Sequence, residues 1–319
     1  MGCENVDSPA LTALLPVVLI VVCGVGAAKL GWIRATALKD LSQLVFYVLT
    51  PALLFRTMSS VQIAQLDFQP IIVYFLAAGL VLVATLLRYG FNTLAATLAM
   101  GHTFSNNVMI GIPLIGLVFG AEGLVVLLTL ISVHALVLLG CGTLILELAQ
   151  ARQNHGAGRS QGLLRTVGQA LKNSVVHPVP LPIIAGLLFA QTGLSLPIVI
   201  DKPLQLLGSA LGPMALLLVG VTLAYSRIVT LVHPALRITS IKIVVHPLVF
   251  LAVAWALGLT GLPMAVMALA AALPTGANVL MFAQRYSVAE QEITASIALS
   301  TMACLVTVPA LLLLIQALQ

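Results

Sequence analysis

Two stretches, TFSNNVMIGIPLIG (residues 103–116) and ALPTGANVLMFAQRY (residues 272–286), interrupt apolar runs with asparagine, glycine and proline. Proline inside a helix removes one backbone N–H and clashes with the preceding turn, and glycine lets the chain unwind. Asparagine side chains can bond the backbone groups that unwinding frees. Each stretch therefore predicts a broken helix, and the alternative is a helix with an ordinary proline kink.

The composition around these stretches excludes a water-soluble protein. Of the 319 residues, 61% are hydrophobic and 7% are charged, whereas soluble domains have about 45–50% apolar and about 25% charged residues. So few charges cannot cover a soluble globule, which excludes a cytosolic enzyme, a nucleic-acid-binding module and a disordered chain. The long apolar runs also lack the alternation of β-barrel strands. We therefore predict an all-α polytopic membrane protein in the lipid bilayer.

Ten transmembrane helices are predicted, at about 20 residues per span. The polar stretch 149–174 divides the chain into a first five-helix repeat (1–148), a cytoplasmic connector (149–174) and a second five-helix repeat (175–319). Because five is odd, the second half is inverted relative to the first, which is an inverted-topology repeat. The predicted spans are 11–31, 40–57, 69–88, 95–119, 123–148, 175–192, 203–226, 238–258, 263–284 and 292–317.

The basic residues support this topology. With the N-terminus outside, twelve of the fourteen fall on or near the inner side, and only Arg56 and Lys202 fall outside. An excess of this size follows the positive-inside rule, so both termini are predicted outside. The inner residues are Lys29, Arg34, Lys39, Arg88, Arg152, Arg159, Arg165, Lys172, Arg227, Arg237, Lys242 and Arg285.

The broken fourth and ninth helices predict a binding site where they cross in mid-membrane. Each break creates a helix N-terminus with free N–H groups and about half a positive charge, which suits a carboxylate or phosphate. Broken helices at matching places in inverted halves are typical of transporter sites. We expect the prolines to fix the breaks and the asparagines to hold the unwound backbone and the substrate. The candidate substrate-binding residues are Asn106, Asn107, Gly111, Pro113, Pro274, Thr275, Gly276 and Asn278.

Three titratable side chains inside predicted spans are further candidates. His134 lies deep in the fifth span and is either a packing histidine or a contact for substrate or proton. Lys242 and His246 share a face of the eighth span, where Lys242 either snorkels to the inner surface or braces the crossing with a fixed charge in place of a mobile cation. No nucleophile–base pair, nucleotide-binding motif or metal-binding motif is visible. We therefore expect no enzyme activity, no cofactor and no metal.

Several motifs carry a family resemblance over the whole chain. SNNVMIGIPL is similar to an Asn-x-x-x-x-Gly-Ile-Pro pattern that begins at Asn106, and LPTGANVLMFAQRY is similar to Pro-x-Gly-x-Asn followed by Phe-Ala-x-x-Tyr. YVLTPALLF, GPMALLLVG and the Lys-x-x-x-His-Pro stretch at 242–247 add support. The family that these motifs resemble is the auxin efflux carrier family, which includes plant PIN carriers and bacterial permeases. The short connector is similar to that of bacterial members.

The resemblance implies a secondary transporter of small organic carboxylate anions in the plasma (inner) membrane. Spans 1, 2, 6 and 7 would form a scaffold, expected to form a homodimer, and spans 3–5 and 8–10 a transport domain with an elevator-like motion. His134 falls where plant relatives place a polar side chain at the substrate site, and a histidine there is a departure.

Two other functions stay open at this point. One is a membrane sensor that binds a metabolite without moving it, against which the absence of an appended soluble domain argues. The other is a sodium-coupled symporter of the bile-acid type, against which the lack of a buried acidic ligand argues.

Overall fold

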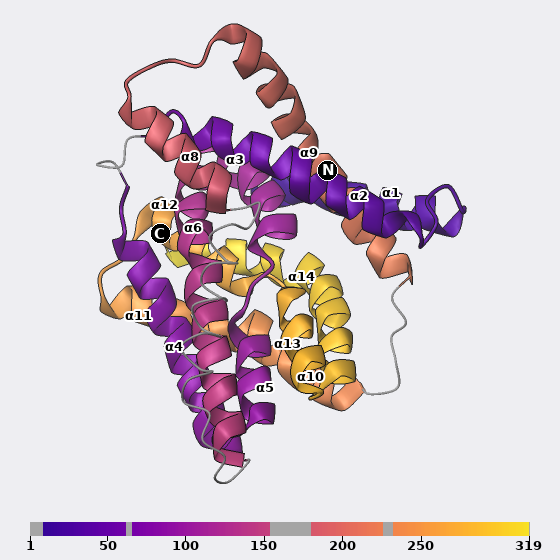
Figure 1. Ribbon diagram of the computed structural model, residues 1–319, viewed down its shortest axis with the longest axis vertical. Coiled ribbons are helices and arrows are strands. Elements are labelled where there is room, and N and C mark those ends of the chain that lie inside the picture. Colours follow the sequence, from indigo (N-terminus) through magenta and orange to yellow (C-terminus); the bar gives the residue numbers. More distant parts are fainter. Residues whose placement is uncertain (1–8, 62–65, 154–179, 226–231, 319) are drawn as a thin grey trace, which may run out of the picture.

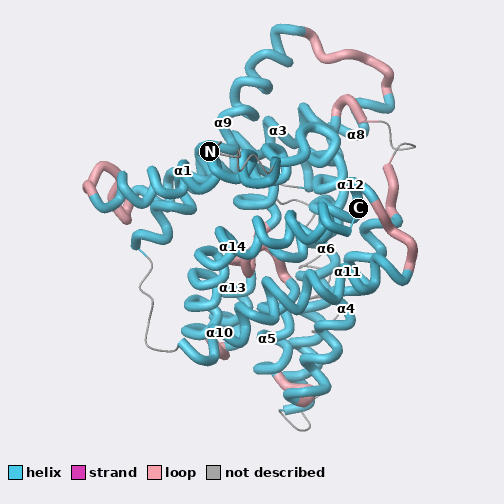
Figure 2. Tube along the Cα trace, turned by 180° about the vertical axis from the view of Figure 1, so that it is seen from behind, coloured by secondary structure: helices cyan, strands magenta, loops and turns pink. Residues whose placement is uncertain are grey.

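The computed structural model describes residues 9–61, 66–153, 180–225 and 232–318. Within these ranges the chain is helical, which confirms the all-α expectation (Figures 1 and 2). Most of the predicted connector and the start of the sixth predicted span lie outside the described residues. The elements are α1 Pro9–Lys29, α2 Ala37–Leu44, η1 Val45–Leu49, α3 Thr50–Met58, α4 Gln69–Tyr89, α5 Thr93–Thr103, η3 Asn107–Gly111, α6 Ile112–Gln153, α8 Pro180–Gln191, α9 Ile198–Tyr225, α10 Val232–Ser240, η4 Ile241–Val245, α11 His246–Ala256, α12 Gly261–Ala272, α13 Asn278–Tyr286 and α14 Glu290–Leu318.

Six helices of the described ranges are long and apolar enough to cross a membrane, by length and composition. Shorter apolar helices accompany them, and all of these helices overlap predicted spans. Gly120, with φ 62°, interrupts α6 between the predicted fourth and fifth spans. The ten-span count and the inverted repeat stay predictions. The six long helices are Ala37–Met58, Gln69–Tyr89, Asn107–His134, Ile198–Tyr225, His233–Ala256 and Glu290–Ile315.

Three helices contain a short π-helical turn, η1, η3 or η4, and a proline follows each turn. Pro51, Pro113 and Pro247 each lie two residues beyond their turn. A proline in a helix clashes with the carbonyl four residues back, and the wider turn relieves this crowding. The residue before each proline then bonds five residues back, as the Thr50 N–H does to the Val45 oxygen. Such turns are frequent at functional sites, and η3 and η4 both carry candidate site residues.

One group of packed helices consists of α1, α3, α8 and α9, from the first part of each half (Figure 1). Helices α1 and α9 cross in backbone contact at Gly24 and Gly220. A Cβ atom on Gly24 would overlap the Leu217 carbonyl oxygen, and one on Gly220 would overlap that of Val21. Small residues allow membrane helices this close approach, so these two glycines hold the first and seventh predicted spans together.

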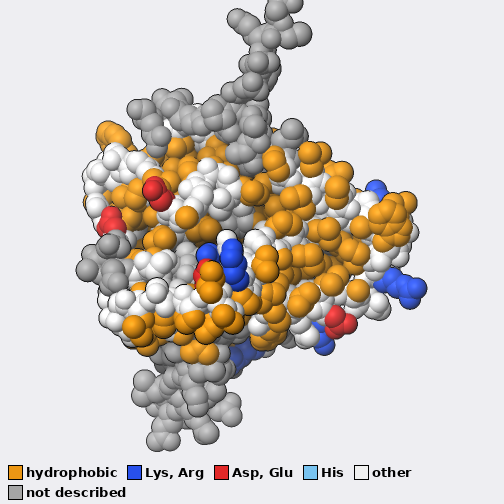
Figure 3. Space-filling view, turned by 90° about the horizontal axis from the view of Figure 1, so that it is seen from above, with side chains coloured by type: hydrophobic (Ala, Val, Ile, Leu, Met, Phe, Trp, Pro, Cys, Tyr) orange, Lys and Arg blue, Asp and Glu red, His pale blue; other side chains and the backbone are white. Residues whose placement is uncertain are grey.

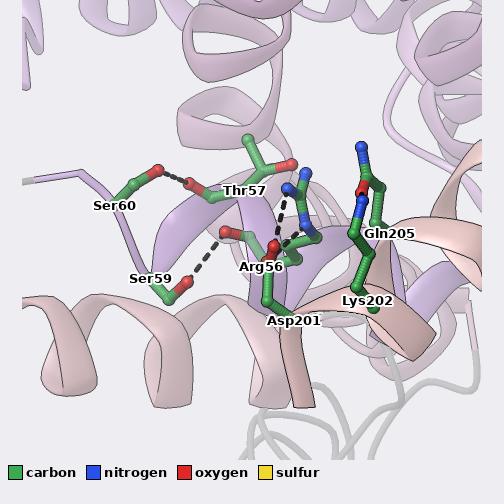
Figure 4. Close-up of polar contacts among 7 residues, drawn as sticks. All are labelled: Arg56, Thr57, Ser59, Ser60, Asp201, Lys202 and Gln205. Atoms are coloured by element: carbon green, nitrogen blue, oxygen red, sulfur yellow. Dashed lines mark hydrogen bonds and ion pairs between the residues drawn. The ribbon is translucent and has the colours of Figure 1, made fainter. Parts of the chain in front are cut away.

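An ion pair between α3 and α9 joins helices of the same group. Arg56 donates to Asp201 from Nε at 2.7 Å and from Nη2 at 3.2 Å (Figure 4). The two side chains are 36% and 30% exposed. Pairs this exposed contribute about 0–1 kcal/mol, so the contact mainly orients the two helix ends.

A second group contains α4, α5, α10, α11, α13 and α14 (Figures 1 and 2). Helix α4 packs along α5 and α11, and α10 packs along α14. Helix α12 lies among them and is buried without interruption from Ala265 to Ala272. At the end of α13, Tyr286 donates to Glu147 at 2.8 Å, which connects α13 with the C-terminal part of α6.

On the face shown in Figure 3, hydrophobic side chains cover much of the surface, and charged ones are scattered. Trp255 and Leu87, for example, are 85% and 82% exposed. Apolar patches of this extent are rare on soluble monomers, but they are the expected surface toward lipid. The surface therefore agrees with a multi-pass membrane protein.

Candidate functional site

The first break lies between α5 and η3. Helix α5 ends at Thr103, the chain is extended at Phe104, and Asn106 caps the next helical segment by accepting the Met109 N–H at 3.3 Å. An asparagine is a preferred residue at this position because its short side chain reaches the free N–H groups of the first turn. Pro113 lies inside α6 after the π turn, so the unwound residues precede it rather than surround it.

The second break lies between α12 and α13. Helix α12 ends at Ala272, Leu273 is extended with ψ 155°, and α13 begins at Asn278. Pro274 lies within the unwound segment, where its missing N–H breaks no helical bond. Both sequence stretches with asparagine, glycine and proline are therefore interrupted helices rather than kinked ones.

The two unwound segments pair with each other. The Asn106 N–H donates to the Pro274 oxygen at 2.9 Å, and the Gly276 N–H donates to the Phe104 oxygen at 2.9 Å. These bonds form an isolated antiparallel bridge between Ser105 and Thr275. Each segment thereby provides hydrogen-bond partners for backbone groups of the other. Such partners are needed inside a membrane, because no water is available there to bond unpaired backbone groups.

Gly276 and Thr275 show how tightly this bridge is held. A Cβ atom on Gly276 would lie 2.7 Å from Phe104 Cδ1 and 3.2 Å from the Ser105 oxygen. Thr275 is fully buried, its N–H donates to Ser300 Oγ at 3.1 Å, and its hydroxyl donates to the Gly101 oxygen at 3.2 Å. The bridge is therefore fixed by contacts on both sides.

Lys242 closes the C-terminal end of α12. Its Nζ donates to the Ala271 oxygen at 2.6 Å and to the Leu273 oxygen at 2.8 Å. These carbonyls lie at the end of the broken helix, where the helix dipole is negative. The side chain is fully buried, so Lys242 does not snorkel to the surface.

A polar cluster lies on the other side of the first break. The Tyr74 hydroxyl lies 3.1 Å from Ser105 Oγ and 3.4 Å from His134 Nε2. The His246 ring packs against the Tyr74 ring at 5.6 Å, and neither of its nitrogens has a hydrogen-bond partner among the described residues. His246 also follows Lys242 by four residues, so both reach the region of the breaks from η4 and α11.

A pocket of about 120 Å³ opens beside the bridge. Its described lining contains no acidic side chain. Asn107 is 3% exposed, and neither atom of its side-chain amide has a partner in the described part of the chain. The lining residues are Phe46, Phe104, Ser105, Asn106, Asn107, Val108, Met109, Ile131, His134, Gly276, Ala277 and Asn278.

Five of the nine predicted substrate-binding residues line this pocket, and the other four do not. Gly111, Pro113, Pro274 and Thr275 do not belong to the described lining. Gly111 instead packs against Leu273, because a Cβ there would lie 2.8 Å from Leu273 Cδ1. The five lining residues are Asn106, Asn107, His134, Gly276 and Asn278.

Sequence reasoning missed Tyr74, although its hydroxyl connects Ser105 with His134. A tyrosine in the apolar run YFLAAGL has no feature that separates it from tyrosines at the membrane surface. Ser105 adjoins Asn106 and could have been included from the same polar cluster. Both residues are buried.

Comparison with known proteins finds relatives of this sequence among membrane transporters. The chain is 24% identical over 310 residues to a protein of Rhizobium meliloti (strain 1021) that is named "Putative malonate transporter", and the match covers 95% of each chain. The sequence model of the family described as "Membrane transport protein" matches residues 9–312. The chain therefore belongs to this family of membrane transporters, that of the auxin efflux carriers, which its two Asn-Gly-Pro motifs resemble.

Proposed function

We propose that this membrane transporter carries small organic carboxylate anions, and that the pocket beside the paired breaks binds the carboxylate. The observation that carries the proposal is the meeting of two helix N-termini, one at Asn106 and one at Asn278, in a pocket without acidic lining. Helix N-termini present free N–H groups and a positive dipole end to an anion. The name of the Rhizobium relative belongs to the same substrate class.

In this proposal the asparagines bind the substrate directly. The Asn107 amide is buried and lacks partners among the described residues. An unpaired buried polar group costs about 1–3 kcal/mol, and a carboxylate that accepts from Asn107 Nδ2 removes the part of this cost that the N–H groups carry. Asn278 reaches the same pocket from the opposite half of the chain.

The pocket size fits a small acid. A water molecule needs about 10–15 Å³ of such space, so 120 Å³ corresponds to several water molecules. This is the size class of a short mono- or dicarboxylate. His134 lies in the wall with its Nε2 toward Tyr74 and supplies a polar contact for specificity or proton dependence.

Lys242 takes the role of a fixed cation at the crossing. It bonds the carbonyl end of α12 from within the protein, where a mobile cation would otherwise be needed to neutralise the helix end. His246 lies on the same face and packs against the Tyr74 ring. The arrangement favours a carrier that does not depend on sodium.

Transport proceeds by an elevator-like motion in the same proposal. Helices α4, α5, α6 and α10–α14 move as a transport domain, while α1, α2, α3, α8 and α9 form the scaffold and the homodimer interface. The backbone contact of α1 with α9 supports a rigid scaffold. The positive-inside count supports an orientation with both termini outside the plasma membrane.

The test is uptake of radiolabelled carboxylates into proteoliposomes. Asn106→Ala and Asn278→Ala each remove a side chain from the pocket, and we expect uptake to fall at least tenfold, since one lost bond to a charged group costs about 1.5–3 kcal/mol. Sodium replacement by potassium is expected to leave the wild-type rate unchanged.

Asn92→Ala is the matched control. Asn92 also caps a helix, accepting the Ala95 N–H at 2.8 Å, but it lies at the far end of α5 outside the pocket. A fall in uptake confined to the two pocket variants supports the proposal. Wild-type uptake by both pocket variants would refute the site, and ligand binding without counterflow would show a sensor instead.

A further inference from the structure

A second, larger groove lies away from the paired breaks, between α4 and the α10–α11 segment. Its volume is about 720 Å³. Its lining is mostly apolar, with two arginines and one buried histidine of α5. The lining includes Ala84, Arg88, His102, Arg237, Val245 and Val249.

The groove arises because its two walls diverge. Helix α4 packs along α11 at one end, whereas α10 packs against α14 and α5 at the other. The C-terminal half of α4 thereby separates from η4 and α10. His102 and its helix α5 fill the bottom of the gap but not its opening.

The apolar part of the groove has the shape and chemistry of an acyl-chain site. Ala84, Val245 and Val249 line it from opposite walls, and Val245 is 43% exposed. An open apolar channel of this kind on the outer face of a membrane protein accommodates a hydrocarbon chain.

The other end of the groove is basic. Arg237 Nη1 donates to the Tyr89 hydroxyl at 3.1 Å, and the Arg88 guanidinium carbon lies 5.7 Å from the centre of the Tyr89 ring. Both arginines are exposed, and no acidic residue belongs to the described lining of the groove. Glu292 lies in the neighbouring pocket between α5, α10 and α14. Both guanidinium groups contact Tyr89 and still have N–H donors that can bind an anionic group such as a phosphate.

His102 adds a polar atom at the floor. It is 1% exposed, its Nδ1 lies 2.9 Å from Thr85 Oγ1, and its Nε2 has no hydrogen-bond partner in the described part of the chain. Such a buried polar atom needs a partner. Because the Thr85 hydroxyl donates to the Val81 oxygen at 2.8 Å, Nδ1 of His102 is the donor to Thr85 and Nε2 is an acceptor. A hydroxyl group of the ligand, rather than its phosphate, can donate to Nε2.

We propose that this groove binds an anionic phospholipid, with one acyl chain between α4 and α11 and the phosphate between Arg88 and Arg237. In the predicted positive-inside topology both arginines lie on the cytoplasmic side, where anionic lipids are attracted to basic pockets between helices. The site is separate from the carboxylate pocket and does not depend on the transported substrate. A lipid bound there makes the stability of the transport domain depend on the lipid composition of the inner leaflet.

The experiment measures thermal unfolding of the delipidated protein in detergent against added palmitoyl-oleoyl phosphatidylglycerol. Phosphatidylcholine with the same chains tests the acyl chain alone, and inorganic phosphate tests the anion alone. A ligand that prefers the folded state raises its stability. We expect stabilisation by phosphatidylglycerol, little by phosphatidylcholine and none by phosphate.

Three variants define the site. Arg88→Ala/Arg237→Ala is expected to raise the half-saturating lipid concentration about thirtyfold, because each basic side chain near an anionic surface contributes about fivefold. Ala84→Phe blocks the channel and keeps both arginines, and the same loss is expected. Arg34→Ala/Lys39→Ala removes two other exposed basic side chains predicted on the same side and should change nothing.

The outcomes separate the alternatives. Equal stabilisation by both lipids, or wild-type lipid response in the double arginine variant, would overturn the proposal. Phosphate acting as well as phosphatidylglycerol would show a free-anion site and also overturn it. Native mass spectrometry of the purified protein, with phosphatidylglycerol retained by the wild type and lost from Ala84→Phe, gives independent support.

Discussion

Replacing Lys242 with methionine tests how the broken helix α12 is held. The substitution keeps an unbranched side chain of similar length but removes the donor to the Ala271 and Leu273 oxygens, at 2.6 and 2.8 Å. Both carbonyls then lie in a fully buried place without this partner. The bridge between Ser105 and Thr275 begins two residues beyond Leu273, so the perturbation reaches the binding pocket.

The magnitude follows from the two bonds. A hydrogen bond to a charged donor contributes about 1.5–3 kcal/mol. Two such bonds contribute more free energy than the protein regains when the Lys242 charge is no longer buried. Each buried carbonyl left without its donor costs about 1–3 kcal/mol, so the two together cost about 2–6 kcal/mol. At roughly 2 °C per kcal/mol for a chain of this size, the Tm falls by about 4–12 °C.

Thermal unfolding in detergent and uptake in proteoliposomes measure the two consequences. Lys39→Met is the control, because Lys39 is an exposed lysine on α2. We expect Lys39→Met to match the wild type in both assays, and Lys242→Met to lose stability and most of its uptake. A Lys242→Met protein that unfolds within 2 °C of the wild type and transports normally would refute the role of Lys242.

Three further variants test the fold around the site. Gly220→Leu should lower the free energy of unfolding by about 3 kcal/mol, since its Cβ overlaps backbone of α1 and overpacking costs about 1–3 kcal/mol or more; unchanged denaturation would contradict the close crossing. Gly276→Val should reduce uptake about 100-fold, because the added side chain pushes Phe104 away from the bridge and small displacements at a site have effects of this size. Normal uptake would show that the bridge does not need a small residue at this position. Arg56→Ala should cost less than about 1 kcal/mol, and less still in high salt, because the pair is one-third exposed; a larger, salt-independent loss in chemical denaturation would show a stronger contact.

The interrupted helices could be predicted because asparagine, glycine and proline are conspicuous in an apolar chain. Asn106 and Asn278 mark the two breaks closely. Asn106 caps the restarting helix by accepting the Met109 N–H, and Asn278 is the first residue of α13. The exact place of the first break could not be predicted from Pro113. The π turn η3 accommodates that proline within a helix, and the unwound residues lie before it.

The partners of the site residues were not accessible from the sequence. Lys242 could be predicted as a candidate from its depth in a span, but not its two carbonyl acceptors, which lie about 30 residues further along the chain. Tyr74 joins Ser105 and His134 only because α4 packs beside α5. Such contacts depend on how helices pack, which residue patterns along one helix do not specify.

The bridge between Ser105 and Thr275 is made from main-chain atoms of both halves. Its own hydrogen bonds therefore use no side-chain atoms, although Gly276 must remain small and the contacts of Thr275 with Ser300 and Gly101 hold it in place. Mutations can then alter the chemistry facing the pocket while the architecture that supports it persists. Proteins that share this bridge can therefore change their substrate during evolution by substitutions in the pocket wall, while the bridge itself stays the same.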